Sequence, residues 1–112
     1  MSATTVAIIP SKSAENIQTT QYTSADLKTI IDKFTATNVT GVSVTFAVNL
    51  VTASGAAGAS NLMFSRTLLP GQCYTCPEVV GHTLESGDFI STLAGAGASI
   101  TIRASGRQVT SS

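Results

Sequence analysis

The chain has 112 residues, which is enough for one domain with a single modest hydrophobic core. Only 11% of the residues are charged and the formal net charge is +0, whereas disordered chains combine low hydrophobicity with high net charge. The six basic residues are scattered along the sequence, so no cluster of cations indicates a nucleic-acid partner. No apolar run approaches the roughly 18 residues of a membrane span and no signal peptide is recognisable, so we expect synthesis in the cytoplasm and no membrane partner.

Residues 4–9 form the first predicted strand. The segment is short and rich in β-branched residues, and Pro10 directly after it is typical of an edge or first strand, because proline cannot donate a hydrogen bond to a neighbour.

The segment from Leu27 to Phe34 is ambiguous between helix and strand. Four apolar residues lie at the i, i+3, i+4 and i+7 spacing of a helix face: Leu27, Ile30, Ile31 and Phe34. Ser24 or Asp26 is suited to cap the start of such a helix. A strand would need Ile30 and Phe34 to face inward with Asp32 between them, at a bulge. The pattern by itself slightly favours the helix.

An alternating pattern over residues 42–51 is the clearest strand signal in the chain. Five apolar residues alternate with small or polar ones, which predicts that the apolar set faces a core: Val42, Val44, Phe46, Val48 and Leu50. Residues 38–41 (Asn-Val-Thr-Gly) before this strand predict a turn.

The second half of the chain contains shorter strand signals that are separated by turns. Residues 62–69 lead into Leu-Pro-Gly-Gln at 69–72, where proline presets the first corner and glycine permits the positive φ of the second. Residues 73–76 predict a short strand. Ser-Gly-Asp at 86–88 predicts a turn before a strand at 89–93. Residues 99–104 alternate again, with Ile100 and Ile102 on one side and Thr101 and Arg103 on the other.

Strands at this spacing predict an all-β fold, a single antiparallel β-sandwich of jelly-roll or Ig-like type with about 7–8 short strands. We expect residues 1–112 to form one domain. Residues 1–13 and 107–112 are candidates for flexible arms that order only on assembly.

Two stretches of small residues, 54–60 (S-G-A-A-G-A-S) and 94–99 (A-G-A-G-A-S), look alike. The simpler interpretation is two flexible surface loops. The alternative is that small residues let a neighbouring backbone approach closely at a packed subunit contact. Neither stretch has the spacing of a phosphate-binding loop.

Cys73 and Cys76 form a C-x-x-C motif, and His82 follows six residues later. A structural zinc ion takes four ligands, so three soft ligands do not complete a site within one chain. A redox role needs the first cysteine at a helix N-terminus after a strand, whereas here the motif lies between a Pro-Gly turn and Pro77. We therefore expect two ordinary thiols, or a local disulfide formed on exposure to oxidant, and no metal or cofactor.

His82 is the only histidine, so any hydrolytic triad would have to include it. Glu85 and Asp88 lie close in sequence, but no nucleophile motif accompanies them, and Glu-Ser-Gly-Asp fits a β-turn more simply. We expect no catalytic residues and no enzyme activity.

Several turn motifs occur in a fixed order between these strands. They are N-x-T-G at 38–41, the apolar strand at 42–51, L-x-x-G at 68–71, L-x-x-G-D at 84–88 and the closing strand at 99–106. This order resembles a family of small bacteriophage virion proteins with a β-sandwich fold, from roughly Gln18 onward. The cysteine pair departs from the family pattern. The resemblance favours a strand over a helix from Leu27 to Phe34.

The resemblance implies a non-enzymatic structural component of a bacteriophage particle, most concretely a capsid decoration or cement protein that stabilises contacts between capsid subunits. A neck or tail accessory protein (fibre, collar or adaptor) is the alternative, and a receptor- or glycan-binding β-sandwich module is the second alternative. The expected partners are further copies of the chain itself, as a homo-oligomer, and other virion proteins such as the major capsid protein. The expected location is the virion, after synthesis in the host bacterial cytoplasm.

Overall fold

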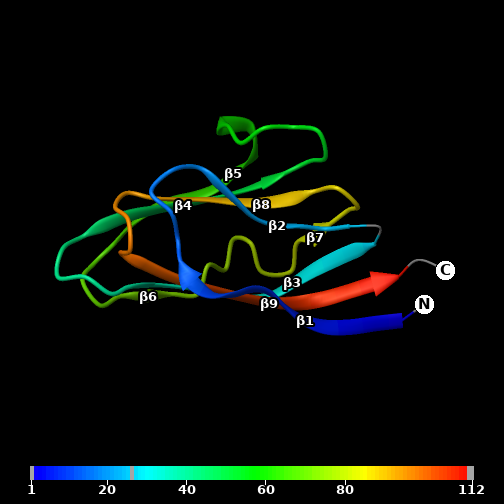
Figure 1. The fold of residues 1–112 in the computed structure, drawn as a ribbon, viewed down its shortest axis with the longest axis horizontal. Coiled ribbons are helices and arrows are strands. Elements are labelled where there is room, and N and C mark those ends of the chain that lie inside the picture. The colour runs from blue at the N-terminus through cyan, green and yellow to red at the C-terminus, as the bar shows by residue number, and fades with distance from the viewer. Residues whose placement is uncertain (1, 26, 111–112) are drawn as a thin grey trace.

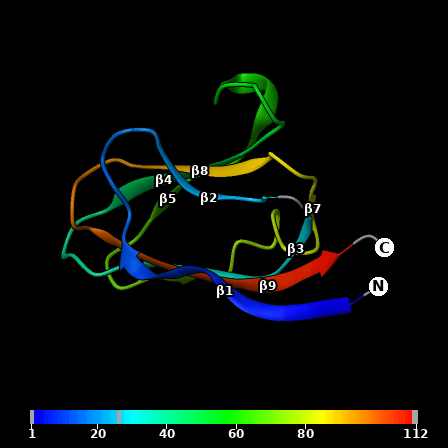
Figure 2. The same ribbon diagram turned by 45° about the vertical axis from the view of Figure 1, so that its right-hand side comes forward.

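A computed structural model describes residues 2–25 and 27–110 and shows two antiparallel sheets that pack face to face (Figures 1 and 2). The described residues form nine strands and a single 3₁₀ turn, η1 (Ala59–Asn61): β1 (Ser2–Ser13), β2 (Thr19–Thr23), β3 (Lys28–Asn38), β4 (Val44–Val51), β5 (Leu62–Leu68), β6 (Cys73–Tyr74), β7 (Thr83–Leu84), β8 (Phe89–Ala94) and β9 (Ile100–Thr110). The predicted all-β sandwich is confirmed. Three of its strands are longer than expected, with 12 residues in β1 and 11 in β3 and β9. In the described ranges no helix is long and apolar enough to cross a membrane.

The strand order is that of one long antiparallel hairpin whose two arms are folded together into two sheets. The first sheet has the order β1-β9-β3-β6, with β7 also on β3, and the second has the order β2-β8-β4-β5. Strands β6 and β7 pair with different parts of β3, so they act as one interrupted strand. The first strand, β1, therefore pairs with the last, β9, and β2 pairs with β8. β3 pairs with β6 and β7, and β4 pairs with β5 in the central hairpin. This is the jelly-roll topology, which decides between the two predicted sandwich types.

A column of aromatic rings joins the two sheets through the core. Phe34 of β3 lies 6.5 Å from Phe46 of β4, and Phe46 lies 5.9 Å from Phe64 of β5, between ring centroids. Phe64 in turn meets Tyr74 of β6 edge-on at 5.4 Å. Tilted and edge-to-face rings at these distances stabilise a core beyond the area that they bury. With no tryptophan in the chain, these rings are the large pieces around which the aliphatic side chains pack.

Strand β4 confirms the predicted alternation from Val44 to Val48, but Asn49 and Val51 are buried as well, and Val42 lies outside the strand. Val44, Phe46 and Val48 are buried in the core, and Leu50 packs against it. Val42 was expected on the same face but precedes the strand, and its side chain is 64% exposed. The alternation begins only where the backbone enters the sheet, because β4 starts its pairing at Val44.

The ambiguous segment is a strand, as the resemblance favoured. Pairing with β9 shifts register between Ile31 and Lys33, so Asp32 is the extra residue of a bulge. Ile31 and Phe34 are both fully buried, whereas Ile30, which we expected to face inward, is only half-buried. The inserted residue places buried side chains three positions apart, and that spacing imitates a helix.

The described residues at both ends lie in regular structure. Residues 2–6 of β1 pair in continuous register with residues 106–110 of β9, and the rest of β1 pairs with residues 101–104, so the candidate arms at 2–13 and 107–110 lie in paired strands. Residues 1, 111 and 112 of these candidate arms are outside the described residues. β1 is an edge strand, as predicted, but it continues through Pro10 with register shifts around it.

The two predicted glycine turns are confirmed. Gly71 has φ +75° and the amide of Gln72 donates to the carbonyl of Leu69 at 2.9 Å. Gly87 has φ +90° and the amide of Asp88 donates to the carbonyl of Glu85 at 3.0 Å. Glycine adopts this backbone conformation at low cost.

The buried amide of Asn38 joins the two sheets where β3 ends. Its Nδ2 donates to the carbonyls of Val42 and Leu68 at 2.7 and 2.9 Å, and its Oδ1 accepts from the amide and hydroxyl of Thr40 at 2.9 and 2.7 Å. Asn38 is fully buried, and its bond to the carbonyl of Leu68 lies in the interior, whereas the carbonyl of Val42 also accepts from the Thr40 hydroxyl at 3.0 Å.

We predict that Asn38→Ala lowers the free energy of unfolding by about 2–3 kcal/mol, because it removes four hydrogen bonds, one of them the buried bond to the carbonyl of Leu68. Urea denaturation measures the change. Asn16→Ala, the same substitution at an exposed residue, is the control and should change stability by less than about 0.5 kcal/mol. Equal effects of the two substitutions would contradict the role assigned to Asn38.

Candidate functional site

Four loops meet at one end of the sandwich, opposite the two chain termini (Figure 1, left). They are residues 14–18, 39–43, 69–72 and 95–99, and we call this surface the loop end. Backbone hydrogen bonds tie the loops together: Val39 N to Ser99 O at 2.9 Å, Gly71 N to Asn38 O at 3.0 Å, and Ala94 N to Glu15 O at 3.0 Å. The loop end is therefore a preformed surface rather than four independent loops.

The loop end displays apolar side chains. Seven large hydrophobic residues are exposed in the described chain, and the four most exposed belong to these loops: Ile17 (67%), Val39 (59%), Val42 (64%) and Leu69 (60%). Exposed Pro70, Ala96 and Ala98 lie in the same loops. Single exposed hydrophobic residues are ordinary, whereas contiguous exposed apolar patches are a general mark of interaction sites.

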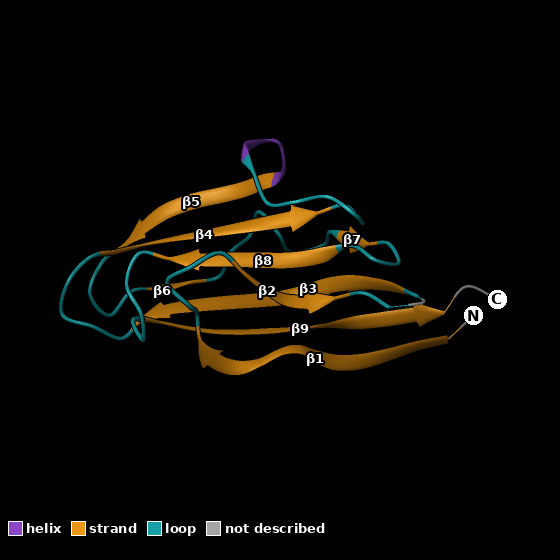
Figure 3. Cartoon of the chain, turned by 45° about the horizontal axis from the view of Figure 1, so that its top comes forward, coloured by secondary structure: helices purple, strands orange, loops and turns teal. Residues whose placement is uncertain are grey.

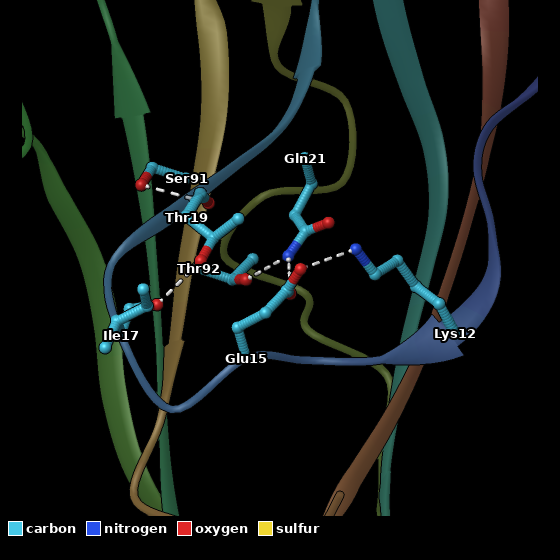
Figure 4. A network of polar contacts seen from close by, with 7 residues as sticks. All are labelled: Lys12, Glu15, Ile17, Thr19, Gln21, Ser91 and Thr92. Carbon is cyan, nitrogen blue, oxygen red and sulfur yellow. Dashed lines mark hydrogen bonds and ion pairs between the residues drawn. The ribbon is translucent and has the colours of Figure 1, made fainter. Parts of the chain in front are cut away.

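The loop end is also nearly free of charge. Its one charged residue, Glu15, accepts hydrogen bonds from Lys12 Nζ at 2.9 Å and Gln21 Nε2 at 2.8 Å (Figure 4). The hydrogen bond from Lys12 has the larger effect in lowering the pKa of Glu15, and the bond from Gln21 lowers it further. The carboxylate therefore stays ionised and paired. Depletion of charge is the compositional mark of an interface core.

The loop end contains a shallow pocket between the loop that precedes β4 and the loop that follows β8. Residues 42–45 and 95–96 line a volume of about 240 Å³ beside Val42. A side chain at Gly95 would collide with the hydroxyl of Thr45, since a Cβ there would lie 2.5 Å from Thr45 Oγ1. The small residues of 94–99 thus let the loop pack against β4 within the chain. A close contact with another subunit at this stretch stays a prediction.

The other small-residue stretch, 54–60, has a different setting. It belongs to the loop that rises over the outer face of the second sheet, near η1 (Figure 3). Asn61 holds this loop: its Oδ1 accepts from Gly58 N at 3.0 Å and Asn49 Nδ2 at 2.7 Å. The likeness between the two stretches is compositional only.

The two cysteines have opposite environments. Cys73 is exposed in β6, whereas Cys76 is fully buried, and both are free thiols. Burial raises the pKa of Cys76 to about 12, so at neutral pH it is a protonated thiol and a poor nucleophile. Within residues 2–25 and 27–110, no three His, Cys, Asp or Glu side chains form a group that could hold a metal ion.

The candidate hydrolytic residues have structural contacts. His82 is exposed, and its carbonyl accepts from Ile31 N at 3.0 Å. Asp88 accepts from the amides of Ala53 at 2.9 Å and Glu85 at 3.0 Å, so its carboxylate holds two loops in place. Glu85 lies 3.7 Å from Lys28. The carboxylates of Asp88 and Glu85 thus have structural contacts, and His82 contributes its backbone carbonyl.

A cluster of Arg66, Tyr74 and Glu78 closes one side of the sandwich. The Tyr74 hydroxyl donates to Glu78 at 2.6 Å, and the Arg66 guanidinium lies 4.9 Å above the Tyr74 ring. Burial, and then the bond to Glu78, raise the pKa of Tyr74, while the bond from Tyr74 lowers that of Glu78. The cluster keeps a carboxylate and a neutral phenol together, and it links β5 to β6 across the core opening.

The structure brings basic residues together that are separate in the sequence. Lys33 pairs with Ser105 on β9, so it shares the outer face of the first sheet with Arg103 and Arg107. Asp32 accepts two hydrogen bonds from Arg107 Nε and Nη2, at 3.0 Å each, and offsets one of these charges. Sequence reasoning missed this grouping because it depends on the strand register.

No protein-family model matches the chain, and no curated protein matches it. Among solved structures, a chain in the structure of the infectious bursal disease virus Gx strain is similar, with 11% sequence identity and a TM-score of 0.42. The match covers 97% of this chain and 32% of that one, so the protein spans about a third of the length of its viral neighbour.

We predict that only Cys73 reacts with iodoacetamide in the native protein near neutral pH, because Cys76 is buried and protonated. Mass spectrometry should show one adduct per chain in buffer and two in denaturant. Cys73→Ser is the control and should remain unlabelled until it is unfolded. Two adducts in the native protein would contradict the assigned environment of Cys76.

Proposed function

We propose that the chain is a non-enzymatic structural component of a bacteriophage particle that docks onto other virion proteins through its loop end. The observation that carries this proposal is the gathering of the four most exposed large hydrophobic residues on one preformed, nearly uncharged surface. The resemblance of the turn motifs to small phage virion proteins supports the particle as the setting, and the jelly roll is a fold that viral capsid domains use.

The shape of the molecule is suited to end-on docking. The Cα extents are 48 × 26 × 19 Å, and the loop end lies at one extremity of the long axis (Figure 1). Most concretely, the protein is a capsid decoration or cement protein that stabilises contacts between subunits of the major capsid protein and associates with further copies of itself.

A neck or tail accessory position is the second candidate, because the same surface could dock there. Copy number separates the two, since a lattice role requires on the order of hundreds of copies and a ring only about a dozen. Purified particles analysed by quantitative mass spectrometry would measure this number. Absence of the protein from purified virions would end both proposals.

Glycan binding is less well supported by the structure. Sugar sites offer exposed aromatic platforms, but all six aromatic side chains here are buried or half-buried. The hydroxyls of Tyr22 and Tyr74 are engaged with Thr29 and Glu78. Binding on a glycan array would reverse this ranking.

We predict that Val42→Asp and Leu69→Asp each weaken binding to particles that lack the protein by about ten-fold or more, because burial of one such side chain contributes about 1.5–3 kcal/mol. Co-sedimentation over a range of concentrations measures the effect. Val80→Asp, at another exposed apolar residue outside the loop end, should bind like the natural chain. Unchanged binding by both loop-end variants, with folding verified by circular dichroism, would exclude this surface.

A further inference from the structure

The two sheets end in four edges, and an unprotected edge is a template for another strand. The edges are β1 and the interrupted β6/β7 in the first sheet, and β2 and β5 in the second. Three of the four edges carry features that discourage pairing. The fourth, β1, is divided between a blocked half and an open half.

The β5 edge is blocked by an inward charge. Arg66 pairs with the buried Phe46, so its side chain starts on the core side of the edge strand. It then reaches Glu78, with Nε 3.6 Å from Oε2, and covers the Tyr74 ring. An added strand would bury this charge, and inward-pointing charges are a known protection of sheet edges.

The β6/β7 and β2 edges are short or irregular. β6 and β7 contain two residues each and are separated by residues 75–82. β2 has five residues and shifts register between Thr20 and Tyr22. Neither edge offers an unbroken row of backbone groups as long as residues 2–6 of β1.

The β1 edge changes character along its length. Its second half has register shifts on both sides of Ile9, together with Pro10 and the charged Lys12. Its first half, residues 2–6, pairs in unbroken register with β9 and contains no proline, no charge and no bulge. Ala3, Thr4 and Thr5 are exposed there, and threonine is a good strand former.

We propose that this open half of β1 pairs antiparallel with the same segment of a second copy, so that the first sheets of two molecules become one continuous sheet. A second copy fits because the segment is uncharged and the whole chain has a formal net charge of +0, so two copies do not repel each other. A two-fold contact of this kind uses the same segment on both molecules and closes after two copies.

This contact deepens the proposed function, on which its biological role rests. The open half of β1 lies at the terminal end of the molecule, away from the loop end (Figure 3). Antiparallel pairing points the two long axes in opposite directions. The dimer therefore presents one loop end at each extremity, which lets it bridge two docking positions on a particle.

Sedimentation equilibrium on the purified chain tests the contact, and the natural chain should fit a monomer–dimer equilibrium. Thr4→Lys should weaken dimerisation at least ten-fold, because it places like charges near the two-fold axis in a segment whose partner on β9 is the neutral Gln108. Thr67→Lys, on the protected β5 edge, is the matched control and should dimerise like the natural chain.

A charge-swap experiment distinguishes loss of the contact from misfolding of the Thr4→Lys variant. Mixing Thr4→Lys with Thr4→Glu should restore a dimer that neither variant forms alone. A monomeric natural chain at about 100 μM, or a Thr4→Lys dimer as tight as the natural one, would overturn the contact. Either result would leave particle docking by the loop end intact, whereas a dimer that never binds particles would overturn the proposed function alone.

Discussion

The buried amide of Asn38 is the contact on which the shape of the loop end depends. It lies at the last residue of β3 and reaches the end of β5 in the opposite sheet through the carbonyl of Leu68. Its backbone also exchanges hydrogen bonds with Gly71 and Gln72. One residue thereby fixes the separation of the two sheets and the course of two loops. The positions of the exposed apolar side chains on those loops therefore depend on Asn38.

A second buried polar group serves the opposite end of the sandwich. The hydroxyl of Thr29 meets those of Tyr22 and Ser24 at 2.8 and 2.9 Å, and Gln108 Nε2 donates to Tyr22 at 3.0 Å. Every buried side-chain nitrogen and oxygen in the described residues has a partner. Polar groups thus close both ends of an aliphatic and aromatic core, and satisfied buried networks of this kind favour a unique packing.

The sequence predicted the fold well where local pattern and tertiary environment agree. β9 alternates because it turns one face to the core, and β4 does so as far as Val48. The glycine turns follow from backbone sterics alone. β3 misled the periodicity argument because the bulge at Asp32 adds a residue that only the partner strand reveals. Val42 is a residue type that is typical of a core, and nothing in the neighbouring sequence shows that the strand starts two residues later, at Val44.

The candidate site was beyond local reasoning for a related reason. Ile17, Val39 and Leu69 lie far apart in the sequence, and only the rolled-up topology brings their loops to one end. The low content of charged residues was visible in the sequence, and the four loops of this end contain one charged residue, Glu15. The cysteines and His82 attracted attention as chemistry-bearing residue types, but their burial and contacts are properties of the folded chain.

The pairing of the first strand with the last has a consequence for biosynthesis. β1 completes its pairing with β9 only after synthesis has reached Thr110, because Ser2 pairs with Thr110. Until then its unpaired edge is exposed on both sides, and topologies dominated by such distant contacts fold slowly. The lack of charge in residues 2–6 therefore carries a risk of aggregation on the ribosome, and faster synthesis of the remaining strands or chaperone capture of the nascent chain would lessen it.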